Sequence, residues 1–441
     1  MFKTVKTIPI LLLCLLCSGL VRAQEPLTLK DALNFALENN VKLRKSRLDI
    51  DGGKYKTQEV RAQALPQITG NVGSTYNPVI GQLVFQDQKI TIGKTWNSTA
   101  GIQLSQQLFD KQVFTGLQAA KTSESYYQLT ANLTEEEIIE LVANNYYQVL
   151  VGRQVLGVND NNIKNVKIAE KIIGDQYANG LAKKIDVDRI KVKLTNLQTK
   201  RQETLNTIAQ LENQLKFSMG MPIATAITLP ADEINKVEAL PALADTLNMS
   251  DRTELKLLGI RKDLQVLQRK AYLAEYYPSL SLSANYVGTG QSDRFGFLNS
   301  NNSGAIYYPA SAIGLTLKVP IFNGFATRSR ARQASIEIRK ADEDIRESKN
   351  ALNQAYENAK IQLKNNINTI KFQRANVTLA QEIYTSTQNN YNNGLATLTD
   401  LLDTEDALTD AQNSYTQALL NYKVAEIQLI KSNGNLKSLV K

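Results

Sequence analysis

The chain has 441 residues, of which 43% are hydrophobic and 21% charged, a composition typical of a folded protein with a large core or an extended architecture. Its net charge of +9 is not gathered into a run of like charge, which argues against a nucleic-acid-binding arm. Because no histidine occurs and the only cysteines, Cys14 and Cys17, lie in the leading apolar segment, we expect no enzymatic activity, no metal site and no cofactor.

The first 23 residues have the pattern of a secretory signal peptide. Lys3 and Lys6 precede a short apolar run over residues 8–16, and small residues suitable for cleavage end at Ala23. The run is too short to span a membrane, and no later stretch reaches about 20 apolar residues. Lipoprotein processing at Cys17 is the alternative, although two leucines precede this cysteine where small residues are expected. We therefore expect an exported chain that is either soluble or inserted in a membrane through strands.

The exported chain starts with a predicted helix that gives way to strands. Thr28 and Asp31 have the spacing of an N-terminal capping pair, and helical spacing from residue 27 continues to residue 64, before Pro66 ends it. The apolar period then changes from about 3.6 to 2. Two alternating segments, 66–76 and 100–109, predict strands of about ten residues with one apolar and one polar face.

Two long helices joined by a glycine-containing turn follow. Helical spacing extends over residues 111–176 and again over 185–216, where apolar residues recur at alternating steps of three and four, as in a coiled coil. The turn between them contains Asn179-Gly180, a pair that favours a change of chain direction. Segment 219–249 contains three prolines and predicts an irregular connection.

The second half repeats this order of elements. The sequence Tyr-Asn-Asn-Gly-Leu-Ala beginning at Tyr391 matches Tyr-Ala-Asn-Gly-Leu-Ala beginning at Tyr177, 214 residues earlier. The expected elements are a helix at 251–276, strands at 278–286 and 313–321, a helix at 328–389 and, after the second turn, a helix to residue 431. Such a repeat indicates one structure built from two halves, and the two strands of each half are expected to pair as a hairpin. The predicted organisation is a signal peptide 1–23, a first repeat 24–218, an irregular segment 219–249, a second repeat 250–434 and a tail 435–441.

The strand pattern fits two environments. In a soluble sandwich the apolar faces would pack on a second sheet, whereas in an outer-membrane barrel they would face lipid and the polar faces water. Export, strand length and aromatic residues near the strand ends favour the barrel. Four strands cannot close a barrel, because the smallest bacterial barrels have eight, so a barrel requires several copies of the chain. Trp96, between the first two strands, is expected to be a loop or interface aromatic.

With these features the chain resembles the TolC-type family of outer-membrane efflux channels. The resemblance covers essentially the whole mature chain and rests on the duplicated order of elements and on the two Asn-Gly-Leu-Ala turns. It also rests on Leu65-Pro66 and Tyr277-Pro278 before the first strand of each half, and on Val319-Pro320-Ile321-Phe322. It implies an α+β membrane protein that forms a homotrimer, with a long α-helical coiled-coil tunnel and a transmembrane β-barrel to which each chain gives four of twelve strands.

The resemblance also implies a function and partners. The trimer would be the exit duct of a tripartite efflux system of the RND type or of a type I secretion system, with passive passage to the exterior. Its partners would be a periplasmic adaptor (membrane fusion) protein, an inner-membrane transporter and outer-membrane lipid, with no nucleic acid. The alternative is a soluble periplasmic coiled-coil scaffold or tethering protein.

The two turns match the tips that family members use to dock the adaptor. The matching residues are Gly180, Leu181 and Ala182 in the first turn and Gly394, Leu395 and Ala396 in the second. A plain interhelical turn is the alternative, since Asn-Gly accommodates a positive φ. A leucine repeated in both turns is not explained by turn chemistry.

Four residues near the turns match the family's entrance. Asp400 and Asp403 match the pore constriction, and their spacing of three places them on one helix face, where a trimer would form acidic rings. Tyr391 and Asp186 match the network that holds the entrance closed. The alternatives are that the aspartates complement the helix dipole and that Tyr391 packs in a core. An arginine that some members use to tie the tips together falls at Ala396, so closure is expected to differ here.

Overall fold

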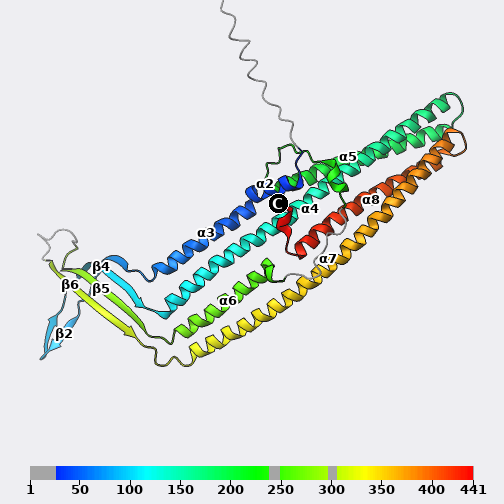
Figure 1. Ribbon diagram of the computed structural model, residues 1–441. Coiled ribbons are helices and arrows are strands. Elements are labelled where there is room, and N and C mark those ends of the chain that lie inside the picture. Colours follow the sequence, from blue (N-terminus) through cyan, green and yellow to red (C-terminus); the bar gives the residue numbers. More distant parts are fainter. Residues whose placement is uncertain (1–25, 238–248, 296–304, 441) are drawn as a thin grey trace, which may run out of the picture. The chain divides into compact units, whose positions relative to one another are not determined.

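The computed structural model describes residues 26–237, 249–295 and 305–440 of the chain (Figure 1). The expected signal peptide at 1–23, its two cysteines and part of the irregular segment 219–249 lie outside these residues. The described chain divides into two compact units. Of the described residues, the first unit contains those within 26–45, 132–237, 249–252 and 349–440, and the second contains those within 46–131, 253–295 and 305–348.

The helices agree closely with the predicted segments. They are α2 (Leu29–Asn39), α3 (Val41–Ala62), α4 (Lys111–Ala178), α5 (Lys184–Met219), α6 (Thr253–Ala274), α7 (Ala326–Asn392) and α8 (Leu398–Ser432), with short 3-10 turns η1 (Ala231–Asn235), η2 (Met249–Asp251) and η3 (Leu436–Leu439). Within the described part of the chain, no helix combines the length and the apolar composition needed to cross a membrane.

The single helix predicted over residues 27–64 is wrong in one respect, because it is broken at Asn40. Thr28 and Asp31 form the expected capping box at the start of α2, but Asn40 has an extended backbone and separates α2 from α3. The Oδ1 atom of Asn40 accepts a hydrogen bond from the Leu43 amide (3.1 Å), and its Nδ2 donates to the Ser218 carbonyl (2.7 Å). Asn40 therefore caps α3 and joins the helix break to the end of α5.

The strands of the two halves form one sheet. The strands are β1 (Gln67–Tyr76), β2 (Gln82–Phe85), β3 (Gln88–Thr91), β4 (Trp96–Phe109), β5 (Ser279–Ser292) and β6 (Ile306–Lys318). An antiparallel sheet has the order β1-β4-β5-β6, so the hairpin predicted within each half is confirmed, and the β4–β5 pair joins the halves.

Two features of the first hairpin were not expected. The ribbon of β2 and β3 turns at Gln86 and Asp87, both with positive φ, between the two strands predicted for this half. Trp96 is the first residue of β4 and not a loop aromatic. Its ring centroid lies 4.9 Å from that of Tyr76, its partner in β1, and 4.7 Å from that of Phe295.

The sheet has one apolar and one polar face. Register aligns apolar residues across all four strands, in the row Ile68, Leu104, Ala284 and Ile313. The adjacent row, on the opposite face, is Thr69, Gln103, Asn285 and Ala312. In the single chain the apolar face is uncovered, and the Ile313 side chain is 82% exposed.

The first unit has an apolar core to which α2, α4, α5, α7 and α8 contribute. Tyr146 of α4 is fully buried there, and its hydroxyl is within hydrogen-bonding distance of the Leu27 carbonyl (3.0 Å) and of the Glu233 carboxylate. Burial, together with Glu233, raises the pKa of this hydroxyl far above its usual value. These contacts pack Leu27, two residues before α2, and the η1 turn onto α4.

Candidate functional site

The two repeated turns have the same backbone geometry. Gly180 follows α4 and Gly394 follows α7, with φ values of 74° and 76°. In each turn the amide of the next leucine donates to the carbonyl five residues back, at Gln176 and Asn390, over 2.8 Å in both cases. This helix ending requires a residue in the left-handed region, which explains the glycine at both positions.

The leucine after each glycine points into solvent. Leu181 is 80% exposed and Leu395 is 79% exposed, whereas Ala182 packs against a buried cluster next to the turns. Both turns belong to the first unit, where they lie close together (Figure 1). Each turn therefore presents one exposed leucine in the same backbone setting.

An apolar cluster and two polar contacts hold the helical hairpins together next to the turns. The cluster, called here the tip cluster, takes residues from four helices: Val166, Ala169, Ile173, Ile190, Tyr384, Leu398, Leu401, Leu402 and Leu408. Between hairpins, the Arg189 guanidinium donates to the Thr399 hydroxyl (2.9 Å), and Lys193 forms an ion pair with Asp406. Ala396, which stands where some family members have an arginine, cannot make such a contact. Arg189, in the hairpin of α4 and α5, makes one instead.

Asp400 and Asp403 are both exposed on the first two turns of α8. The Asp400 carboxylate accepts hydrogen bonds from the Thr397 amide (2.9 Å) and hydroxyl (2.7 Å), which hold the pKa of Asp400 below its usual value. Asp400 therefore has a structural role as half of a capping box. Among the described residues, Asp403 has no hydrogen bond or ion pair through its side chain, so capping explains only one of the two acids.

The two predicted entrance residues, Tyr391 and Asp186, come close together within one chain. Tyr391 is half-buried against the tip cluster, and Asp186 lies in the first turn of α5. Burial raises the pKa of the Tyr391 hydroxyl, and the negative charge of Asp186 raises it further. Among the described residues, however, no hydrogen bond joins their side chains.

Glu405 is a buried acid that the sequence analysis missed. Glu405 is only 3% exposed, and one of its carboxyl oxygens has no hydrogen-bond partner in the described part of the chain. Burial raises the pKa of Glu405 to about 7; Lys193 and a hydrogen bond with Asn165 act in the opposite direction, whereas Asp406 adds to the increase. Its spacing from Leu401 and Leu408 places it on the apolar face of α8, and this spacing was the available signal.

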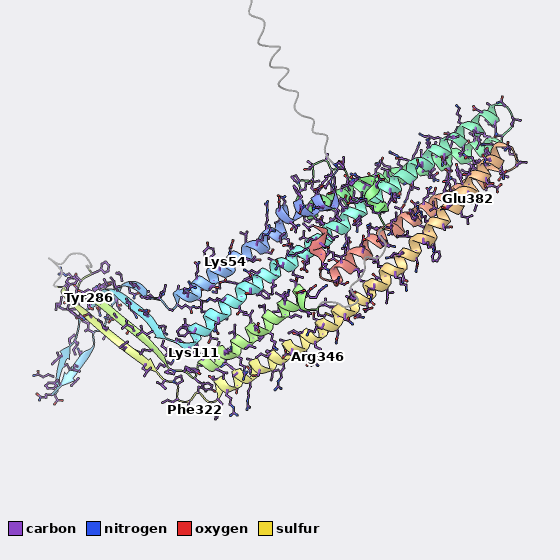
Figure 2. The ribbon with its side chains drawn as sticks, viewed as in Figure 1. Lys54, Lys111, Tyr286, Phe322, Arg346 and Glu382 are labelled. Atoms are coloured by element: carbon purple, nitrogen blue, oxygen red, sulfur yellow. The ribbon has the colours of Figure 1, made fainter. Side chains whose placement is uncertain are left out.

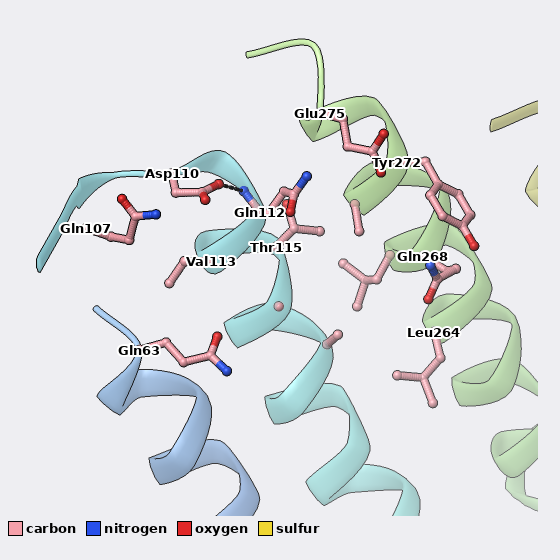
Figure 3. A pocket seen from close by; sticks show the side chains of 14 residues that line it. Gln63, Gln107, Asp110, Gln112, Val113, Thr115, Leu264, Gln268, Tyr272 and Glu275 are labelled. Atoms are coloured by element: carbon pink, nitrogen blue, oxygen red, sulfur yellow. Dashed lines mark hydrogen bonds between the residues drawn. The ribbon is translucent and has the colours of Figure 1, made fainter. Parts of the chain in front are cut away.

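The second unit contains a cavity of about 670 Å³, lined by both polar and apolar residues, at the helix ends near the sheet (Figure 3). Gln63 and Gln112 are among its lining residues, together with two carboxylates. Asp110 accepts a hydrogen bond from the Gln112 amide (2.8 Å), and Glu275 binds Arg330 (2.5 Å). Within the described ranges, no group of three or more potential metal ligands occurs here or elsewhere.

Known proteins resemble this chain over most of its length. The family model described as "Outer membrane efflux protein" matches residues 32–221 and 261–435. The outer membrane protein TolC of Salmonella enteritidis is 24% identical over 98% of this chain and 86% of that protein. The alkaline protease secretion protein AprF of Pseudomonas aeruginosa is 23% identical over 91% of this chain and 83% of that protein. The crystal structure of the outer membrane protein VceC of Vibrio cholerae has a TM-score of 0.70 at 16% identity and covers 92% of this chain and 96% of that chain.

Proposed function

The chain belongs to the outer membrane efflux protein family, and from this premise we propose that three copies of it form one passive duct through the outer membrane. The duct would be the exit of a tripartite efflux system or of a type I secretion system. Two similar proteins have names that point to these roles, the alkaline protease secretion protein AprF and the cation efflux system protein CusC. Energy for transport would come from an inner-membrane transporter.

The four-stranded sheet carries this proposal. Its apolar face is continuous and exposed in one chain, and β1 and β6 are its edges. A hollow of about 430 Å³ on the sheet is lined largely by polar residues, including Asn71, Gln103 and Asn285. A sheet with one exposed apolar face and two open edges supports contact with lipid on that face and pairing with further strands at the edges. Three copies would supply twelve strands.

The tips support a periplasmic adaptor as partner. Leu181 and Leu395 would contact apolar positions on the adaptor, while the glycines set the turn that presents them. Ala182 and Ala396 would let the adaptor approach the helix starts closely.

The acidic residues beside the tips support a cation-selective entrance. In the trimer Asp403, and with it Asp400, would form rings of negative charge around the axis. Tyr391 and Asp186 would belong to the contacts that hold this entrance closed, to which the structure adds Arg189 as a further candidate.

A lysine substitution on each face of β6 tests the proposal. Leu315→Lys places a charge on the apolar face and should sharply reduce the yield of outer-membrane trimer, because a lysine facing lipid costs about 2–4 kcal/mol near the bilayer midplane. The control Thr316→Lys, on the polar face, should leave trimer formation intact. Trimers would be measured as heat-dissociable bands from detergent-extracted outer membranes. Recovery of the unchanged protein as a soluble periplasmic monomer would rule out the duct and favour a soluble scaffold.

A further inference from the structure

The helix ends that adjoin the sheet carry exposed cations without ion pairs. We call these residues the junction cations: Arg61 at the end of α3, Arg269 and Lys270 near the end of α6, and Arg328 and Arg332 at the start of α7. All are exposed, and all belong to the second unit. With respect to the described residues, none of the five has a side-chain hydrogen bond or ion pair.

Several cations farther along the same helices are neutralised. On α7, Lys340 pairs with Glu337 (2.8 Å) and Arg346 with Glu343 (3.0 Å). On α3, Lys54 pairs with Asp51 (2.8 Å). Figure 2 places Arg346 along α7, away from the sheet, whereas Lys111 and Phe322 lie where strands and helices meet.

The acids near the junction already have partners. Glu275 pairs with Arg330 (2.5 Å), and Glu59 pairs with Lys56 (2.7 Å). Asp110 accepts a hydrogen bond from the backbone of α4. None of these three acids is paired with a junction cation, so the five cations are available to an anionic ligand.

Exposed aromatic side chains lie between the cations of α6 and α7 and the strands that adjoin these two helices. Tyr276 and Tyr277 follow α6, and Phe322 and Phe325 precede α7, with the two phenyl centroids 5.4 Å apart. The apolar sheet face follows next. At α6 and α7 the order is thus cation, aromatic and apolar strand, which is the order met on passing from the charged surface of a membrane into its interior.

We propose that the junction cations bind the phosphate groups of anionic phospholipids in the membrane leaflet on the helical side of the sheet. The proposal rests on the proposed membrane position of the sheet. Four of the five residues are arginine, whose planar guanidinium can donate two parallel hydrogen bonds to a phosphate. The competing location for these cations is the wall of the water-filled duct, where they would act on permeating ions and not on lipid.

Lipid binding to the full-length, detergent-purified protein tests this inference. Phosphatidylglycerol and phosphatidylcholine with identical acyl chains would be titrated separately, and bound lipid counted by native mass spectrometry. The unchanged protein should prefer phosphatidylglycerol. In the double variant Arg328→Gln/Arg332→Gln, the ratio of phosphatidylglycerol binding to phosphatidylcholine binding should fall about fivefold for each cation removed. The control Arg339→Gln/Arg346→Gln removes the same charge farther along α7 and should keep it.

Channel recordings separate the possible failures. The same preparations would be inserted into planar bilayers of phosphatidylcholine, where conductance tests the duct without any anionic lipid. Two results would overturn the lipid inference without affecting the proposed duct. In the first, the unchanged protein forms channels but binds both lipids equally. In the second, the variant Arg328→Gln/Arg332→Gln keeps the lipid preference of the unchanged protein. Changed ion selectivity with unchanged lipid binding would place the cations in the duct. Absence of channels in any bilayer would instead count against the proposed function.

Discussion

Glu405 lies on the buried face of α8 among side chains of the tip cluster, where an ionised carboxylate is poorly solvated. Its neighbours from the packed helices include Lys193 of α5, which favours the charged form, and Tyr384 of α7, whose pKa burial and Glu405 raise to about 12. Asp406 on α8 opposes ionisation of Glu405. As a result of these opposing effects, Glu405 changes its charge near neutral pH, inside the helical bundle that carries the two turns.

The first prediction is that Glu405 makes stability fall with rising pH. Between the usual carboxyl pKa of 4.5 and about 7, the folded protein holds a proton that the unfolded chain has released. The free energy of unfolding therefore decreases through this window, by an amount of order 3 kcal/mol, and stays lower above it. Glu405→Gln should abolish the decrease, measured as thermal midpoints in detergent from pH 4.5 to 8. Asp410→Asn, on the exposed side of α8, should retain it; the same slope in Glu405→Gln would contradict the assignment.

The second prediction separates the two aspartates. Asp403→Ala should reduce the cation preference of the channel in planar bilayers without lowering the thermal midpoint, because the Asp403 carboxylate has no hydrogen bond or ion pair among the described residues. Asp400→Ala should reduce both, since it also removes the capping box with Thr397. If a variant with both substitutions, Asp400→Ala/Asp403→Ala, kept the ion selectivity of the unchanged channel, the two acids would act only at the start of the helix.

At the scale of elements, the long helices and the strand faces could be predicted, because apolar periodicity records which side of an element is covered. The break at Asn40 could not, since it depends on the Ser218 carbonyl, 178 positions away in the sequence. The β2–β3 ribbon could not, because its turn uses Gln86 and Asp87 in place of the usual Asn-Gly or Asp-Gly. Of the candidate site, the tip glycines could be predicted from local chemistry, whereas the contacts of Arg189 and Glu405 arise only when the hairpins pack.

The third prediction concerns the turn as a docking element. Leu395→Ser should reduce export in cells at least tenfold while trimers form normally, because the side chain is exposed and its loss leaves the fold intact. Leu379→Ser removes an exposed leucine from the body of α7, and export should be retained. Minimum inhibitory concentrations of exported drugs provide the measurement. Equal export by the Leu395→Ser and Leu379→Ser variants would mean that the Leu395 side chain does not contact a partner protein.

At the scale of the whole molecule, duplication is visible in the register of the strands. Ile68 pairs with Leu104 in the first hairpin, and Leu280 pairs with Leu317 at the corresponding positions of the second. The sequence predicted two similar hairpins, but it held no information on how the first would meet the second. That contact comes from β4 and β5, which align Leu104 with Ala284.

The β4–β5 pair has a consequence for assembly, since it is an internal copy of the seam expected between protomers. By the repeat, Leu317 corresponds to Leu104 and Val72 to Ala284, so Leu317 should face Val72 of the next copy. Val72→Cys/Leu317→Cys should give intermolecular cross-links on oxidation, seen as dimers and trimers on denaturing gels, whereas Val72→Cys/Thr316→Cys, with side chains on opposite faces, should not. Monomers alone from both pairs would contradict this seam. The proposed trimer would thus be a pseudo-sixfold ring of hairpins. Three of its six seams would form when each chain folds, and the other three would form only when the copies assemble.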